Sequence, residues 1–146
     1  MQLSEHFTLE EFEASETAER LALDNAIQDG DVINNIVALV TTVLEPLRTL
    51  LDVPLIISSG YRSEEVNRAV GGAVTSQHLT GSAADVRAKI SPMKIAQTAH
   101  TTPEIWEQVD QMIIYPGFVH FSHKNNGQAQ RNQCLYSQYY TGEKTI

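Results

Sequence analysis

The feature that most constrains the fold is a run of apolar residues at helical spacing between residues 32 and 51. Residues three and four positions apart share one face of an α-helix, so this run predicts a long helix with an apolar face. Asp29 precedes the run and suits an N-cap, whereas Pro46 lies inside it and lacks the N–H of a helix interior. We therefore expect a helix that begins after Asp29, buries one face and kinks or breaks near Pro46. Its apolar positions are Val32, Ile33, Ile36, Val37, Val40, Val43, Leu44, Leu47, Leu50 and Leu51.

Shorter elements are indicated on both sides of this helix. Thr8 and Glu11 have the capping-box spacing of a helix start, and Ser63 and Ser91 are further N-cap candidates. Helices are predicted at residues 9–14, 17–23, 64–70, 93–100 and 103–108. Strands are predicted at residues 54–59 (buried), 83–86, 111–115, 118–122 and 135–140, with a hairpin turn at 116–117. This order predicts an α+β fold: one domain over residues 1–146, with an antiparallel sheet of about four strands and helices packed on it.

Composition excludes several classes of protein. Ten Lys and Arg against eighteen Asp and Glu give a net charge of -8, so nucleic acid is not an expected partner. The single cysteine, Cys134, excludes an intramolecular disulfide framework. The start has no basic and apolar leader, and no uninterrupted apolar run approaches the length of a membrane span. We therefore expect a monomer that has no signal peptide or membrane span and is made in the cytoplasm.

His78 and Asp85 lie seven residues apart in a loop rich in small and polar residues, so both side chains can reach one cation. His120 offers a third ligand from a predicted strand, and two histidines with one carboxylate leave the fourth position of a catalytic zinc site open. His123 is the alternative third ligand, but residues three apart on a strand face opposite sides, so both histidines cannot reach the metal. Spacing alone also fits a solvated His78 and a turn or cap role for Asp85.

The segment from Ser76 to Asp85 resembles a known family: it matches every fixed position of the S-x-H-x-x-G-x-A-x-D motif of the zinc D-Ala-D-Ala peptidases. This family includes D,D-carboxypeptidases, D,D-dipeptidases and phage L-alanyl-D-glutamate endolysins, and its fold resembles the Hedgehog signalling domain. Residues 59–63 (Ser-Gly-Tyr-Arg-Ser) and 118–122 (Phe-Val-His-Phe-Ser) resemble two further segments of the family. Residues 7–12 are similar to the start of a small phage- and Bacteroides-type branch.

This resemblance implies a peptidase that holds one Zn2+ ion and whose metal-bound water attacks a peptide bond of the peptidoglycan stem peptide. The implied zinc ligands are His78, Asp85 and His120. The implied substrate-binding residues are Arg62, Ser76 and Gln77. In the family the matching arginine also stabilises the developing oxyanion, a role that suits its permanently charged guanidinium.

One position departs from the family pattern. Many active members carry an acidic general base three residues before the last histidine ligand, and this chain has Gly117 there. A general base typically contributes roughly 10²–10⁴ in rate, so the difference bears on activity. Asp110 and Tyr115 flank the preceding predicted strand, and a hairpin can bring either close to the metal.

Three functions follow as hypotheses. The first is a zinc peptidase of carboxypeptidase or endopeptidase type, which reaches the wall after release from the cell or from a phage particle. The second is a zinc-stabilised module that binds wall peptides or a protein partner without hydrolysis. The third is a structural virion or prophage protein in which the metal site is vestigial.

Overall fold

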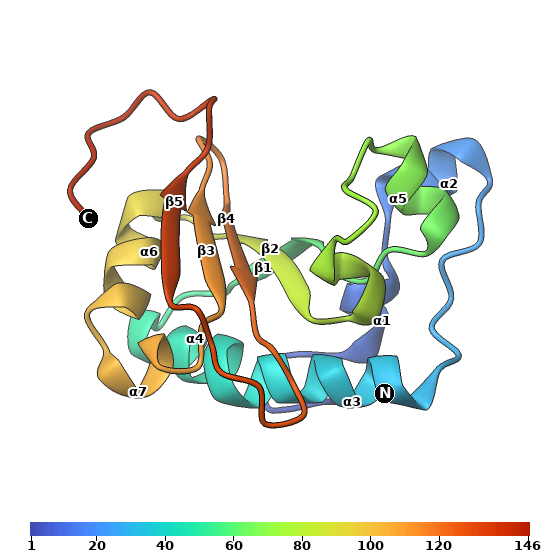
Figure 1. Cartoon of the computed structure of the whole chain (residues 1–146), viewed down its shortest axis with the longest axis horizontal. Helices are drawn as coiled ribbons and strands as arrows, with labels where there is room; N and C mark the ends of the chain where they lie inside the picture. The colour runs from blue at the N-terminus through green and yellow to red at the C-terminus, as the bar shows by residue number, and fades with distance from the viewer.

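The structure is a computed structural model that describes residues 1–146. It is built around one five-stranded sheet (Figure 1). The strands in chain order are β1 (Ile56–Ser59), β2 (Ala83–Arg87), β3 (Gln111–Ile114), β4 (Val119–Ser122) and β5 (Gln133–Tyr136). Their order across the sheet is β1-β2-β4-β3-β5. All neighbours are antiparallel except β3 and β5, which are parallel.

The helices begin at the cap residues that the sequence indicates. Thr8 and Glu11 form the capping box of α1, Asp29 caps α3, Ser63 caps α5 and Ser91 caps α6. The helical elements are α1 (Leu9–Glu13), α2 (Glu16–Leu21), α3 (Gly30–Leu39), the π-helix η1 (Val40–Leu44), α4 (Glu45–Leu51), α5 (Glu64–Ala69), the 3-10 helix η2 (Gln77–Thr80), α6 (Pro92–His100) and α7 (Pro103–Trp106). Only η2 has no counterpart among the predicted elements, because its four residues carry no helical periodicity.

The long helix continues past Pro46 because its backbone widens in the preceding turn. There the chain forms the π-helix η1, in which the N–H of Glu45 donates to the carbonyl of Val40, five residues back. A π turn rearranges the carbonyls that a proline ring would otherwise meet, and Pro46 then occupies the first turn of α4. The expected kink or break is therefore a local π turn in a helix that runs from Gly30 to Leu51.

By length and composition alone, this helix of 22 residues is apolar enough to cross a membrane. Its buried face, however, is part of the hydrophobic core. The fully buried residues that it contributes are Ile36, Leu39, Val40, Val43, Leu44 and Leu47. This burial is typical of the core helix of a globular domain.

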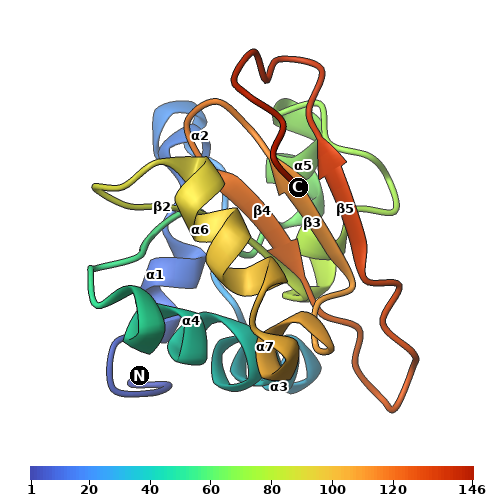
Figure 2. The same cartoon turned by 90° about the vertical axis from the view of Figure 1, so that its left-hand side faces the viewer.

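The sheet has one buried face and one face that carries polar side chains. In β3 and β4, Met112, Ile114, Val119 and Phe121 are fully buried, whereas His120 between the last two is only partly buried. The core-facing residues pack with the long helix and with α6, which crosses β3 and β4 in Figure 2. Helices α1, α2 and α5 gather beyond the β1 edge of the sheet (Figure 1).

Two expectations about the sheet are wrong. The α+β fold is as expected, but the sheet is mixed instead of antiparallel, because β5 joins as a fifth strand parallel to β3. This last strand covers residues 133–136 instead of the predicted 135–140. After β4 the chain returns to the start of β3 and pairs with its free edge, and no local sequence signal sets that pairing. The strand predicted at 54–59 is not buried: β1 pairs only with β2, and Ile56 is 40% exposed at this edge.

Candidate metal centre

His78, Asp85 and His120 meet on the open face of the sheet. Asp85 on β2 lies directly opposite His120 on β4, and η2 brings His78 over the same point. His78 Nε2 lies 3.4 Å from Asp85 Oδ1, and His120 Nδ1 lies 2.9 Å from the same oxygen. One ligand atom from each of the three residues lies within 4.8 Å of the others. The structure therefore brings together the three residues that the family resemblance implied as metal ligands.

This donor set fits zinc. Bonds of about 2.0–2.2 Å in a tetrahedron place ligand atoms roughly 3.3 Å apart, which is close to the two distances at Asp85 Oδ1. Burial by itself raises the pKa of Asp85, but hydrogen bonds from His120 and His78 outweigh it and hold this pKa well below its ordinary value. The carboxylate is therefore ionised, as a metal ligand must be. Two imidazoles and one carboxylate leave room for water or substrate, as in catalytic zinc sites.

A backbone carbonyl orients His78. Its Nδ1–H donates to the carbonyl oxygen of Gly60 over 2.7 Å, which turns Nε2 toward Asp85 as the ring nitrogen that would bind a metal. Gly60 lies against α1, where an added Cβ would be 2.8 Å from the Phe12 Cα. Glycine at this position therefore allows the close approach that places the carbonyl under the histidine.

Arg62 lies beside the metal centre and is held by three groups. Its Nε donates to Ser59 Oγ over 3.2 Å, its Nη1 donates to Asn67 Oδ1 over 3.3 Å, and its Nη2 is 3.7 Å from Asp85 Oδ2. Burial lowers the pKa of Arg62 and the charge of Asp85 opposes this change, but a guanidinium stays charged at any physiological pH. Asn67 also donates to the carbonyl of Ala73 over 2.9 Å, so it links Arg62 to the loop before η2.

Sequence reasoning missed Asn67 and Ser59 as supports of Arg62. Asn67 is 4% exposed and lies on the buried side of α5, beside Val66. The sequence does indicate that Asn67 is a polar residue on the buried side of a short helix. Its contact with Arg62, however, is seen only in the folded structure.

The metal centre opens into a cleft of about 640 Å³. Arg62, Ser76 and Gln77 line this cleft, so the structure places the predicted substrate-binding residues around the metal centre. Asp85 is its only carboxylate. The cleft has the size of a site for a small peptide ligand.

The two predicted base candidates lie in different environments. Tyr115 lines the cleft and stacks on Phe118, with ring centroids 4.3 Å apart. Burial, together with the charge of Asp85, raises the pKa of Tyr115 above 10.0, so its phenol stays protonated at neutral pH. Asp110 is completely buried, does not line the cleft, and accepts hydrogen bonds from Arg131 and Gln77.

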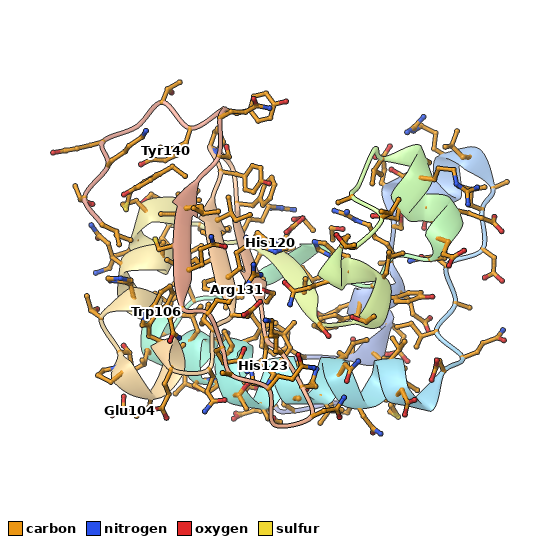
Figure 3. All side chains as sticks on the ribbon, in the orientation of Figure 1. Glu104, Trp106, His120, His123, Arg131 and Tyr140 are labelled. Atoms are coloured by element: carbon orange, nitrogen blue, oxygen red, sulfur yellow. The ribbon has the colours of Figure 1, made fainter.

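His123 and Gly117 both lie outside the metal cluster. His123 donates from Nδ1 to the carbonyl of Gln108 over 2.7 Å and is not part of the metal cluster, as expected for a residue three positions from His120. In Figure 3, His120 lies on the open face and His123 lies nearer to α3. Gly117 lies in the turn between β3 and β4, where an added Cβ would meet no atom within 4 Å.

A His-Asp-His cluster that opens into a cleft has the donor set of a catalytic zinc site. A comparison with family models matches residues 5–122 to Peptidase M15. The chain therefore belongs to the peptidase M15 family, whose members are zinc peptidases that act on peptidoglycan. The matched range includes His78, Asp85, His120 and Arg62, and the match confirms the family resemblance drawn from the motifs. No curated protein matches the chain.

Proposed function

We propose that this protein is a zinc peptidase that cleaves the peptide stems of bacterial cell wall, as a D,D-carboxypeptidase or an endopeptidase. The observation that carries the proposal is the convergence of His78 Nε2, Asp85 Oδ1 and His120 Nδ1 at the base of an open cleft. Membership of the M15 family supports the same activity. Bound zinc would polarise a peptide carbonyl and lower the pKa of a coordinated water toward about 7.

The chain's own residues position the substrate around that point. Arg62 is fixed by Ser59 and Asn67, so its guanidinium is preorganised to stabilise negative charge on a carbonyl oxygen. Tyr115 keeps its proton and therefore serves as a hydrogen-bond donor in the cleft. Asp110 acts as a positioning residue, because its oxygens accept hydrogen bonds from Gln77 next to the His78 ligand and from Arg131.

The proposal is tested by incubating zinc-loaded protein with purified peptidoglycan and with a synthetic stem pentapeptide, followed by mass spectrometry. We expect loss of one peptide bond, abolished by a chelator and in His78→Ala. His100→Gln is the matched control, because His100 is exposed on α6 and lies outside the metal cluster. Release of free D-alanine identifies a carboxypeptidase, whereas larger fragments identify an endopeptidase. Cleavage that persists without metal contradicts the proposal.

A second candidate function is a zinc-containing module that binds wall peptides without hydrolysis. The observation that favours it is the absence of a second carboxylate from the cleft, since Gly117 replaces the usual acid and Asp110 is engaged by Arg131. This alternative predicts stoichiometric zinc and peptide binding by calorimetry but no product in the mass spectra. The same samples therefore distinguish the two functions.

A further inference from the structure

The cleft is cationic although the chain as a whole is acidic. Arg62, Lys124 and Arg131 line it, and Asp85 is its only carboxylate, whereas the net charge of the chain is -8. Asp85 belongs to the metal cluster and lies 3.7 Å from Arg62. Lys124 and Arg131 therefore form a separate source of positive charge in the cleft.

A buried carboxylate fixes the position of Arg131. Asp110 is completely buried and accepts from the Arg131 backbone N–H at 2.9 Å, from its Nε at 3.1 Å and from its Nη2 at 2.8 Å. Nη1 of Arg131 makes no hydrogen bond in this pairing, and the side chain is 47% exposed. The guanidinium is thus held on one side and free to donate on the other.

Lys124 adds a second cation beside the same carboxylate. Its Nζ lies 3.8 Å from Asp110 Oδ1. Gln130 closes the intervening loop, because it accepts from the Lys124 N–H at 2.8 Å and donates to the Lys124 carbonyl at 2.7 Å. Two cations share one inward-facing carboxylate, so one positive charge remains uncompensated and faces the cleft.

The sheet order places this charge across the metal centre from Arg62. Arg62 lies three residues after β1 at one edge of the sheet, whereas Arg131 lies two residues before β5 at the other edge. Asp85 and His120 lie between them on β2 and β4. Arg131 and His120 both line the cleft, and Figure 3 labels both over the β3–β4 part of the sheet. A peptide that crosses the strands can therefore meet the metal centre and both cationic ends.

We propose that Lys124 and Arg131 form a carboxylate-binding subsite, so that the substrate is a peptide with a free carboxylate on the β5 side of the metal centre. The inference rests on the proposed function for its substrate class. Stem peptides offer two such groups, the α-carboxylate of γ-linked D-glutamate and the carboxylate of the terminal D-alanine. Lys124 and Arg131 both lie outside residues 5–122, the range that the family model matches. The subsite is therefore formed by residues that the family model does not describe.

The test uses four fluorescent L-Ala-γ-D-Glu-L-Lys-D-Ala-D-Ala peptides: both carboxylates free, either one amidated, or both amidated. Dissociation constants are measured with metal-free protein, where no metal-dependent turnover intervenes, and kcat/KM is measured with zinc. The variants are Lys124→Gln and the double variant Asp110→Asn/Arg131→Gln, which removes both charges of the buried pair and leaves neither unpaired. Lys94→Gln is the control, because Lys94 is exposed on α6 and lies outside the cleft. Thermal melts verify that each variant is folded.

We expect amidation of one carboxylate to weaken binding by roughly 5–20-fold, the range for a partly exposed charge-assisted contact. The amidated position that causes the loss identifies which carboxylate is bound. Lys124→Gln and the double variant should each reduce the preference for the free carboxylate over the amide. Lys94→Gln should retain this preference. Three results would overturn the subsite. They are equal dissociation constants for all four peptides, no measurable binding of the free-acid peptide, and an unreduced preference for the free carboxylate in both subsite variants. A preserved preference without cleavage in the presence of zinc supports the subsite and contradicts the peptidase proposal.

Discussion

At the scale of single residues, Gly60 links metal binding to packing. Its carbonyl orients His78, and its missing side chain lets the backbone lie against Phe12. Gly60→Ala should therefore lower the free energy of unfolding by about 1–3 kcal/mol, as expected for overpacking. Because the carbonyl must move, zinc affinity should also fall, by about 10–100-fold. Thermal melts and zinc titration measure both effects.

Gly30→Ala is the matched control for this substitution. An added Cβ at Gly30 meets no atom within 4 Å, and the residue lies at the start of α3. Stability and zinc affinity should both remain at wild-type values. An unchanged melting temperature and zinc affinity in Gly60→Ala would show that the Gly60 carbonyl does not position His78.

Asp110 makes the free energy of unfolding of the metal-free protein depend on pH. Burial alone raises the pKa of Asp110, but hydrogen bonds from the side chain and backbone of Arg131 outweigh it and lower this pKa below 3.8. A carboxylate with a lowered pKa in the fold stabilises the protein fully above its unfolded value, and this contribution is lost as pH falls through the folded value. Urea unfolding between pH 5 and 2 should therefore show a loss of stability below about pH 4.

The double variant Asp110→Asn/Arg131→Gln should lose this part of the acid sensitivity, because neither residue then carries a charge. Its unfolding free energy should vary less with pH than that of the wild type over the same range. Identical slopes in the two proteins would assign acid unfolding to other carboxylates.

At the scale of elements, local chemistry made most helices and strands predictable. Caps such as Thr8, Ser63 and Ser91 mark helix starts through contacts within four residues, and the turn at 116–117 sets a hairpin whose strands adjoin in sequence. The parallel pairing of β5 and the edge position of β1 depend on pairing between segments far apart in the sequence. No short window of sequence contains that information.

Helix α5 couples its own stability to the position of Arg62. Ser63 caps this helix by accepting from the Val66 N–H, and the same helix carries Asn67, which holds the guanidinium. Ser63→Ala should lower the unfolding free energy by about 1 kcal/mol and raise KM for a stem peptide. Ser91→Ala removes a similar cap from α6 on the other side of the sheet, so it should cost similar stability without a change in KM. Equal KM effects in the two variants would contradict a role for α5 in the site.

At the scale of the whole molecule, a bound metal would tie η2, β2 and β4 together. Zinc at 100 times its Kd should add about 2.7 kcal/mol of stability, which raises the melting temperature of a domain of this size by roughly 5–10 °C. The increase should be smaller at acidic than at neutral pH, because protons compete with the metal for its ligands. Thermal melts with zinc and with chelator at pH 8 and pH 5 measure it. Identical curves with zinc and with chelator at pH 8 would show that zinc does not bind this site tightly.

The site was only partly predictable from the sequence. His78 and Asp85 lie in one short motif and His120 on a strand with a matching segment, so a resemblance could identify all three. Asn67 and Arg131 have no such pattern, and their partners, Arg62 and Asp110, are brought to them by the fold. Short motifs thus indicate the candidate metal ligands and Arg62, whereas the side chains that hold Arg62 and Arg131 in place are found only in the tertiary structure.

The parallel strand β5 has an evolutionary consequence. It joins the sheet at the free edge of β3, and the loop before it carries Lys124 and Arg131, whereas the metal ligands all precede residue 123. Insertions or substitutions in residues 123–146 can therefore change which peptide binds in the proposed subsite. They leave the three candidate metal ligands unchanged. Related chains that differ mainly after residue 122 should therefore differ in peptide preference more than in zinc affinity.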